Sequence, residues 1–167
     1  PPYALLNEHA ISNFDTAFRL NPPLRSEGDR LAVLQGLADG TIDAIASDHA
    51  PVNRDEKAQP FGQASPGASG IETLFPNLMT MVANNSLSMM QAITAASRAP
   101  ARILGLSGGS LETGTPADVI CFNATSAHVI NQSKFISRSR ISPFHNQPSQ
   151  GKIILSFVNG AFVCDNR

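Results

Sequence analysis

The sequence contains no apolar run of about 18 residues, the length that a helix needs to cross a lipid bilayer. Its start, PPYALLNEHA, also lacks the basic and hydrophobic regions of a secretory signal peptide. Neither sign of charge dominates, because 12 basic residues are matched by 13 acidic ones and the net charge is −1. We therefore expect a soluble, cytoplasmic protein that binds no membrane and no nucleic acid, and whose partners are small molecules or proteins.

Cysteine is scarce, and neither Cys121 nor Cys164 has the C-x-x-C spacing that is typical of a metal site. Both lie in strand-like sequence, far apart along the chain. We expect them to be buried free thiols, as in a cytosolic protein. Because the first residue is proline and a recognisable element follows at once, we expect the sequence to be a fragment of a longer protein.

A ten-residue stretch at positions 42–51, IDAIASDHAP, is the centre of the sequence argument. It is short and partly β-branched, so it predicts a buried strand over Ile42–Ser47 that stops at Pro51. Such a strand places Asp48 and His49 at its carboxyl end, where α/β barrels and open α/β sheets carry their chemistry. The predicted fold class is therefore α/β.

Helical signals lie on both sides of this stretch. Ser26 and Asp29 resemble a capping box, and leucines at helical spacing follow until Gly40. The segment Val52–Gly70 is rich in glycine and proline, and long ordered loops of this kind are usually functional. Further helices are predicted over Ile71–Asn84, after the cap Ser88, and over Ala99–Leu106.

The last third of the sequence changes to short β-type runs. Asn159-Gly160 is a strong signal for a two-residue hairpin turn. The polar segment Ala124–Gln150 has no clear period and predicts an ordered excursion. We therefore predict two parts, barrel-like residues 1–109 and a β-rich tail at 110–167. The predicted strands are Ala117–Asn123, Ile153–Val158 and Ala161–Cys164.

Asp48 is the strongest candidate for chemistry, because a carboxylate at a strand end can act as a metal ligand or as a general base. The alternative is that it only caps a turn. His49 alone predicts a local hydrogen bond, and the other histidines lack ligand-like spacing, so the chain cannot build a metal site by itself. Asn21 and Arg25 flank two prolines and predict either a substrate contact or a polar turn that caps the next helix.

A series of motifs, taken together, resembles dihydroorotase of the amidohydrolase superfamily. These motifs are NPPLR at 21–25, ADGTIDAIASDHAP at 38–51, EK at 56–57, PFG at 60–62, GIETLFP at 70–76, PARILGL at 100–106, LETGTPADVICFN at 111–123 and VNG at 158–160. They occur in the family's order and match the carboxyl-terminal two-fifths of a family member. The resemblance implies the last part of a (β/α)8 TIM barrel plus a small β-sandwich tail, completed by the missing amino-terminal part of the same fold.

The resemblance also implies roles for single residues. Asp48 matches the family's strand-eight aspartate. In the family this residue belongs to the metal site, touches the zinc-bound water and shuttles a proton during ring opening. Asn21 matches an asparagine that contacts the substrate. The residues that match the loop lining the dihydroorotate pocket are Pro60, Phe61, Gly62 and Gly70.

Two positions depart from the family pattern. Tyr3 or Ala4 stands where the family has a metal-binding histidine, and Val52 stands where it has a second histidine. These changes predict that zinc, which the family uses, is absent or incompletely bound.

Three hypotheses follow. The first is a degenerate dihydroorotase-like subunit of pyrimidine biosynthesis, a pseudoenzyme that packs against aspartate transcarbamoylase. The second is a zinc amidohydrolase that interconverts N-carbamoyl-aspartate and dihydroorotate, and the third is an inert breakdown fragment. We expect the 167-residue chain alone to be inactive. We also expect it to pair with another copy, as a homo-oligomer, or with the missing part of its fold.

Overall fold

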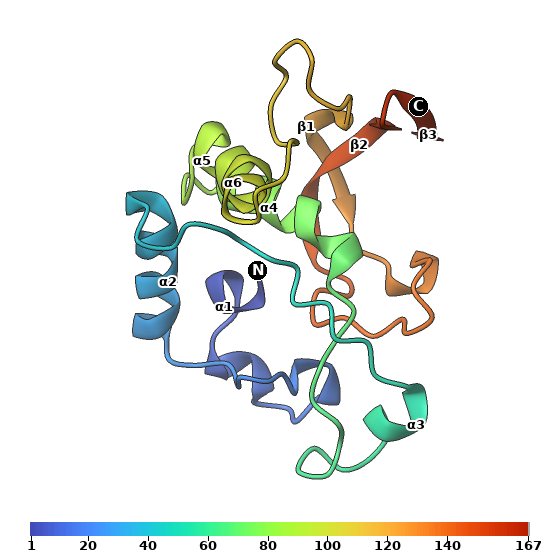
Figure 1. The fold of residues 1–167 in the computed structure, drawn as a ribbon. Coiled ribbons are helices and arrows are strands. Elements are labelled where there is room, and N and C mark those ends of the chain that lie inside the picture. Colours follow the sequence, from blue (N-terminus) through green and yellow to red (C-terminus); the bar gives the residue numbers. More distant parts are fainter. Residues whose placement is uncertain (167) are drawn as a thin grey trace.

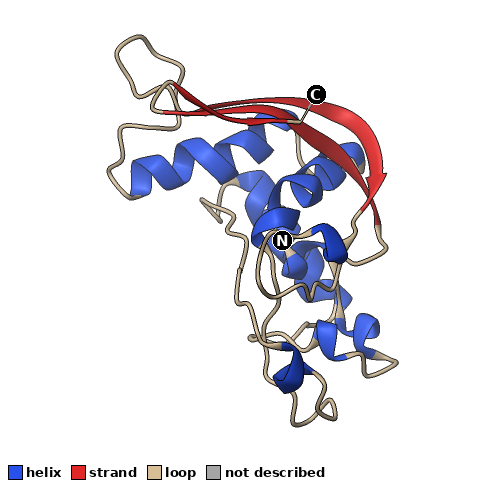
Figure 2. Ribbon diagram, turned by 90° about the vertical axis from the view of Figure 1, so that its right-hand side faces the viewer, coloured by secondary structure: helices blue, strands red, loops and turns tan. Residues whose placement is uncertain are grey.

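The computed structural model describes residues 1–166, which form a group of helices with a three-stranded antiparallel sheet along one side (Figure 1, Figure 2). The fold is mixed α/β, as predicted. Within residues 1–166, every helix is too short or too polar to cross a membrane.

The α-helices are α1 (Pro2–Leu5), α2 (Glu27–Asp39), α3 (Arg54–Lys57), α4 (Leu74–Ala83), α5 (Met89–Ile93) and α6 (Ala99–Ile103). Short turns are η1 (Glu8–Ile11), η2 (Thr16–Phe18), η3 (Ile71–Thr73), the π-helical η4 (Thr94–Arg98) and η5 (Gln132–Lys134). The strands are β1 (Val119–Val129), β2 (Pro148–Val158) and β3 (Ala161–Asp165).

Helix α2 begins and ends where the sequence predicts. The Ser26 hydroxyl accepts a hydrogen bond from the Asp29 N–H at 3.2 Å, and the Asp29 carboxylate accepts one from the Ser26 N–H at 3.1 Å. This reciprocal capping box satisfies two amide groups that would otherwise lack partners at the helix start. Gly40 ends the helix with a φ of 85°, a left-handed conformation that glycine adopts without strain.

The predicted strand over Ile42–Ser47 is wrong for this chain, because residues 43–53 run from α2 to α3 as a coil (Figure 1). The Ile45 N–H donates to the Ala95 carbonyl at 2.9 Å, so this coil contacts the helices and not a neighbouring strand. A β-strand forms only where a second strand pairs with its amide and carbonyl groups. Within residues 1–166 the only sheet is β1-β2-β3, so the predicted barrel remains a prediction.

The helices after the long loop confirm the sequence prediction. Pro76 is the third residue of α4, in the first turn, where its missing N–H breaks no helical hydrogen bond. Ser88 caps α5 through a second capping box, with the Ser88 N–H donating to Gln91 Oε1 at 2.7 Å. Helix α5 continues through η4 into α6. A single helical turn, α3, also forms inside the Val52–Gly70 segment, for which the sequence predicts a long ordered loop.

The sheet is longer than predicted. Strands β1 and β2 pair from Val119 opposite Phe157 to Val129 opposite Pro148, which shortens the excursion between them to residues 130–147. Asn159 and Gly160 have φ values of 49° and 76°, as expected for a two-residue turn with left-handed backbone. The predicted hairpin is therefore confirmed. The second sheet of a sandwich is not among residues 1–166 and stays a prediction.

Helix α4 joins the helical part to the sheet through a common core. The rings of Phe75 and Phe122 meet edge to face at 5.0 Å between centroids, and both pack against the core cluster that contains the fully buried Met81. Both cysteines are free thiols, as predicted, but Cys121 is exposed and Cys164 is half-buried, so the prediction that they are buried is wrong. They lie in β1 and β3, strands that pair on one side only.

Candidate active site

Asp48 lies in the coil after α2, at a turn and not at the end of a strand. Its φ is 53°, a left-handed conformation that Asp and Asn adopt more readily than most other residues. Oδ2 of Asp48 accepts a hydrogen bond from the Tyr3 hydroxyl at 3.1 Å. The residue is exposed, so a water molecule or a substrate can reach the carboxylate.

Tyr3 connects Asp48 to the turn that contains Asn21. Its hydroxyl lies 3.0 Å from the Pro22 carbonyl as well as 3.1 Å from Asp48 Oδ2. Burial raises the pKa of Tyr3 above its ordinary value, and the negative charge and hydrogen bond of Asp48 raise it further. The phenol therefore stays protonated at neutral pH, and its single hydrogen serves these two acceptors.

A cavity of about 300 Å³ is lined by Asn21 and Phe61, two of the predicted substrate-binding residues. Leu20 and Leu24 form an apolar part of its wall, and Arg19 also lines it. A mostly apolar cavity with a few polar groups is typical of a site for a small molecule. The structure thus brings Asn21 and Phe61 together, whereas the other predicted loop residues, Pro60, Gly62 and Gly70, lie outside the lining.

Gly70 lies against the main chain beside Asp48. A Cβ atom at this position would be 2.2 Å from the Ser47 carbonyl oxygen, which is closer than two such atoms can approach. The Gly70 N–H donates to Nδ1 of His49 at 3.2 Å, and the Ile71 N–H lies 3.4 Å from the same nitrogen. His49 therefore accepts hydrogen bonds from residues 21 and 22 positions away and not from its sequence neighbours, so the prediction of a local bond is wrong. Gly70 permits the coil and the loop to pack closely.

Glu72 lies in η3, directly before α4, and its side chain forms hydrogen bonds to the segment 130–147. Its carboxylate accepts hydrogen bonds from the Ile136 N–H at 2.8 Å, the Ser137 N–H at 3.0 Å and the Ser137 hydroxyl at 2.6 Å. Burial acts to raise the pKa of Glu72, but the hydrogen bonds from Ser137 and Ile136 favour the charged form and bring the pKa below its ordinary value.

We expect Glu72→Gln to lower the free energy of unfolding at neutral pH by about 1–3 kcal/mol, because it weakens hydrogen bonds to a charged acceptor. The stabilisation by the native carboxylate is complete above the ordinary Glu pKa of 4.5 and is lost as the pH falls through the lower folded-state pKa. Urea unfolding at several pH values should therefore show a smaller acid-dependent loss in the variant. The exposed Glu112, changed to Gln, is the control, and equal acid dependence in Glu72→Gln and the native protein would contradict this account.

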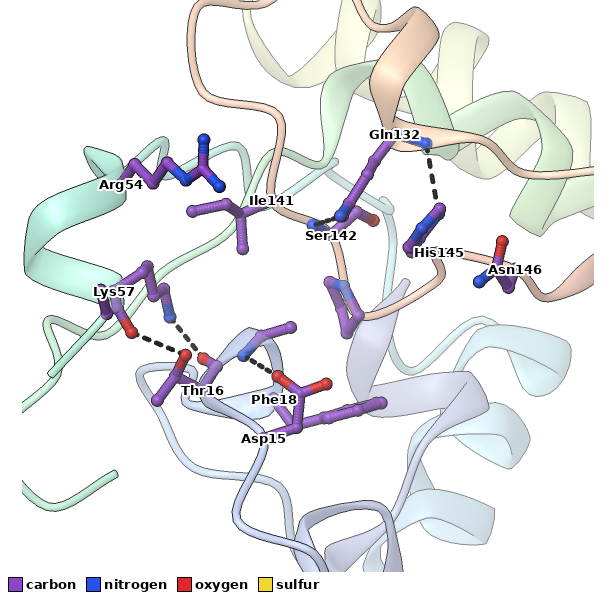
Figure 3. Close-up of a pocket in the computed structure, with 13 residues that line it drawn as sticks. Asp15, Thr16, Phe18, Arg54, Lys57, Gln132, Ile141, Ser142, His145 and Asn146 are labelled. Carbon is purple, nitrogen blue, oxygen red and sulfur yellow. Dashed lines mark hydrogen bonds between the residues drawn. The ribbon is translucent and has the colours of Figure 1, made fainter. Parts of the chain in front are cut away.

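A second cavity, of about 420 Å³, lies between η2, α3 and the segment 130–147 (Figure 3). None of the predicted site residues lines it. Lys57 forms part of its wall and is buried, with only 4% of its surface exposed. Burial and the nearby Arg19 charge lower the pKa of Lys57 from 10.5 to about 8, against the opposing effect of Asp15.

The resemblance to dihydroorotase implies a zinc ion, but residues 1–166 do not provide a complete set of zinc ligands. No three His, Cys, Asp or Glu side chains gather there in a way that would hold a metal ion. Asp48 supplies one carboxylate, which already accepts the Tyr3 hydroxyl. Val52 is buried and packs against the Gly67 position, so it offers no ligand either. The described residues therefore do not fit a zinc site by themselves.

Comparisons with known proteins agree on one family. The model of the amidohydrolase family matches residues 4–163. The chain is 44% identical to a dihydroorotase of Desulforapulum autotrophicum over 163 residues, which cover 98% of the chain and 38% of that protein. A dihydroorotase of Anaplasma phagocytophilum is 39% identical over 98% of the chain and 36% of its own length. The chain thus spans about two-fifths of the length of these relatives.

Comparison with solved structures also finds similar proteins, each of which the chain matches over about two-fifths of its length. The L-hydantoinase (dihydropyrimidinase) of Arthrobacter aurescens superposes with a TM-score of 0.92 at 26% identity, over 99% of the chain and 38% of that protein. The dihydropyrimidinase of Brevibacillus agri has a TM-score of 0.87 at 23% identity, over 99% of the chain and 38% of its own length. The latter likeness concerns the fold alone.

Sequence reasoning missed three residues that organise the site. It treated Tyr3 only as a departure from a family pattern, although its hydroxyl holds Asp48. Arg19, which lines the cavity with Asn21, was not identified at all. Lys57 was named only as part of a motif, without its role as a donor to the Arg19 carbonyl. The basic side chain two residues before the NPPLR motif was the available signal for Arg19, and the EK motif was the signal for Lys57.

Proposed function

Because the chain belongs to the amidohydrolase family, we propose that it forms the proton-transfer and substrate-binding side of a dihydroorotase-type site, which hydrolyses and closes a cyclic amide. The chain spans about two-fifths of its relatives, so we propose this activity for the natural gene product that contains it. The observation that supports the proposal most is the Tyr3 hydroxyl, which lies within hydrogen-bond distance of both Asp48 and the Pro22 carbonyl beside Asn21.

In the proposed reaction, dihydroorotate lies in the cavity lined by Asn21 and Phe61. The Asn21 amide has both donors and acceptors and suits the alternating N–H and C=O groups of a cyclic imide. The Phe61 ring offers an apolar wall. Asp48 takes the proton from a water molecule as its oxygen bonds to the ring carbonyl carbon, and then gives a proton to the nitrogen that leaves when the C–N bond breaks. Ring closure to dihydroorotate runs through the same steps in reverse.

A second candidate function is a non-catalytic subunit that packs against aspartate transcarbamoylase. The buried Val52 favours it, because this residue stands where the family pattern has a histidine, and a valine side chain can neither bind a metal nor transfer a proton. Under this proposal the protein keeps the fold because its surface binds a partner protein, and not because the site catalyses a reaction. Apolar side chains of the sheet, among them Ile120, Phe162 and Val163, are exposed and available for a partner.

We also propose that these exposed sheet residues are covered by further parts of the amidohydrolase fold or by a second copy of the chain. Strands β1 and β3 each carry an unpaired edge within residues 1–166, and such edges pair readily with another strand. A monodisperse monomer in solution, with these edges free, would count against pairing.

Two measurements on the natural gene product decide between the candidates: its zinc content and its rate of dihydroorotate hydrolysis. Stoichiometric zinc together with turnover supports the enzyme and overturns the scaffold. The absence of both, with stoichiometric co-purification of aspartate transcarbamoylase, supports the scaffold and overturns the enzyme.

A further inference from the structure

Lys57 is a buried cation that donates its hydrogen bonds to main-chain carbonyls. Its Nζ donates to the Thr16 carbonyl at 2.8 Å, and the Thr16 hydroxyl donates to the Lys57 carbonyl at 2.8 Å (Figure 3). Nζ also donates to the Arg19 carbonyl at 3.0 Å. No carboxylate lies within salt-bridge distance of this ammonium group in residues 1–166. A buried charge without a salt-bridge partner is costly, so electrostatic stabilisation of the fold does not explain why a lysine occupies this position. It does fix the position of residues 16–19 relative to α3.

Arg19 in turn contacts the loop 60–67, which follows α3, with both its side chain and its main chain. Its Nη1 donates to the Phe61 carbonyl at 2.6 Å, and its guanidinium carbon lies 5.9 Å from the centre of the Phe61 ring. Its own carbonyl accepts the Gly67 N–H at 2.9 Å in addition to Nζ of Lys57. Arg19 therefore contacts the loop near its beginning, at Phe61, and near its end, at Gly67.

We propose that Arg19 and Lys57 form a brace that holds the loop 60–67 at a fixed distance from Asn21 and thereby sets the width of the cavity between them. Asn21 follows Arg19 by two residues, and Arg19, Asn21 and Phe61 line the same cavity. Both brace residues are positioning residues. The inference depends on the proposed function only for the identity of the ligand, because the brace consists of contacts within this chain.

The first test removes the ammonium group. Lys57→Met keeps most of the apolar side chain but removes the Nζ donor from the Thr16 and Arg19 carbonyls, which keep only their main-chain N–H donors. The hydrogen bond between the Arg19 carbonyl and the Gly67 N–H should then open more often by local fluctuation. We expect the Gly67 amide to exchange with solvent about tenfold faster, while the Leu37 amide in α2 keeps its rate.

The matched control is Lys134→Met, which changes an exposed lysine and should leave Gly67 exchange unaltered. A second variant, Arg19→Lys, keeps the charge and the main-chain contacts but loses Nη1, so it should accelerate Gly67 exchange by a smaller factor, about two- to threefold. This milder variant decides the question if Lys57→Met does not fold. Unchanged Gly67 exchange in the folded variants overturns the proposal, and so does an equal acceleration at Leu37, which indicates global destabilisation.

Kinetics add a readout that a purely structural role would not give. In the natural gene product, Arg19→Lys should raise KM for dihydroorotate several-fold and leave kcat within about twofold, because neither brace residue touches the reacting atoms. A fall in kcat with unchanged KM overturns the proposed positioning of the cavity wall. Lack of turnover in the native protein overturns the proposed function instead, and the exchange measurement then still decides whether the brace exists.

Discussion

Asp48→Asn should lower kcat for dihydroorotate hydrolysis by about 10²–10⁴-fold and leave the fold intact, because a side-chain amide cannot take up and return a proton. Asn is the correct replacement on structural grounds. It has the same size, its Oδ1 can accept the Tyr3 hydroxyl as the carboxylate does, and it tolerates the left-handed φ of 53° at this position. The measurement is the initial rate of dihydroorotate hydrolysis by the natural gene product, with circular dichroism to confirm folding.

The control for this experiment is Asp43→Asn, which makes the same chemical change at an exposed position in the same coil. It should retain full activity. Tyr3→Phe removes the hydroxyl that holds Asp48 but leaves the carboxylate free to act, so its rate should fall less than that of Asp48→Asn. If Asp48→Asn keeps the native rate, Asp48 is not the proton carrier and the catalytic role assigned to it is wrong.

Gly70→Ala should lower the free energy of unfolding by about 3 kcal/mol or more, although it adds a single methyl group. The new Cβ would lie 2.2 Å from the Ser47 carbonyl oxygen and 3.4 Å from that of Asp48. The φ of Gly70 is −114°, which alanine adopts freely, so the cost comes from the contact and not from backbone strain. To relieve it, the coil has to move away from the loop and lose the hydrogen bond to His49. Urea unfolding followed by circular dichroism measures the change.

Gly62→Ala is the matched control, because it changes a glycine of the same loop where an added Cβ meets nothing within 4 Å. Its free energy of unfolding should stay within about 0.5 kcal/mol of the native value. Similar unfolding midpoints for Gly70→Ala, Gly62→Ala and the native protein would show that the coil can move without cost. In the natural gene product, Gly70→Ala should also reduce turnover, because Asp48 belongs to the coil that is displaced.

The sequence by itself determined the features that depend on neighbouring residues. The capping boxes at Ser26 and Ser88 join residues three positions apart, and the Asn159-Gly160 turn closes between adjacent strands. The order of the motifs also identified the family. Local hydrogen bonds and backbone preferences act over a few residues, so they can be read without knowing what packs against them.

The tertiary structure alone decided the rest. Ile42–Ser47 has the pattern of a strand, but a strand requires a partner, and residues 1–166 supply none. Tyr3 meets Asp48 across 45 positions, and Gly70 touches Ser47 across the whole Val52–Gly70 loop. Residue spacing does not specify such pairs, because they arise where the packing of distant segments brings two groups within contact distance. The sequence therefore singled out Asp48 as a candidate, whereas its contact with Tyr3 depended on how distant segments pack.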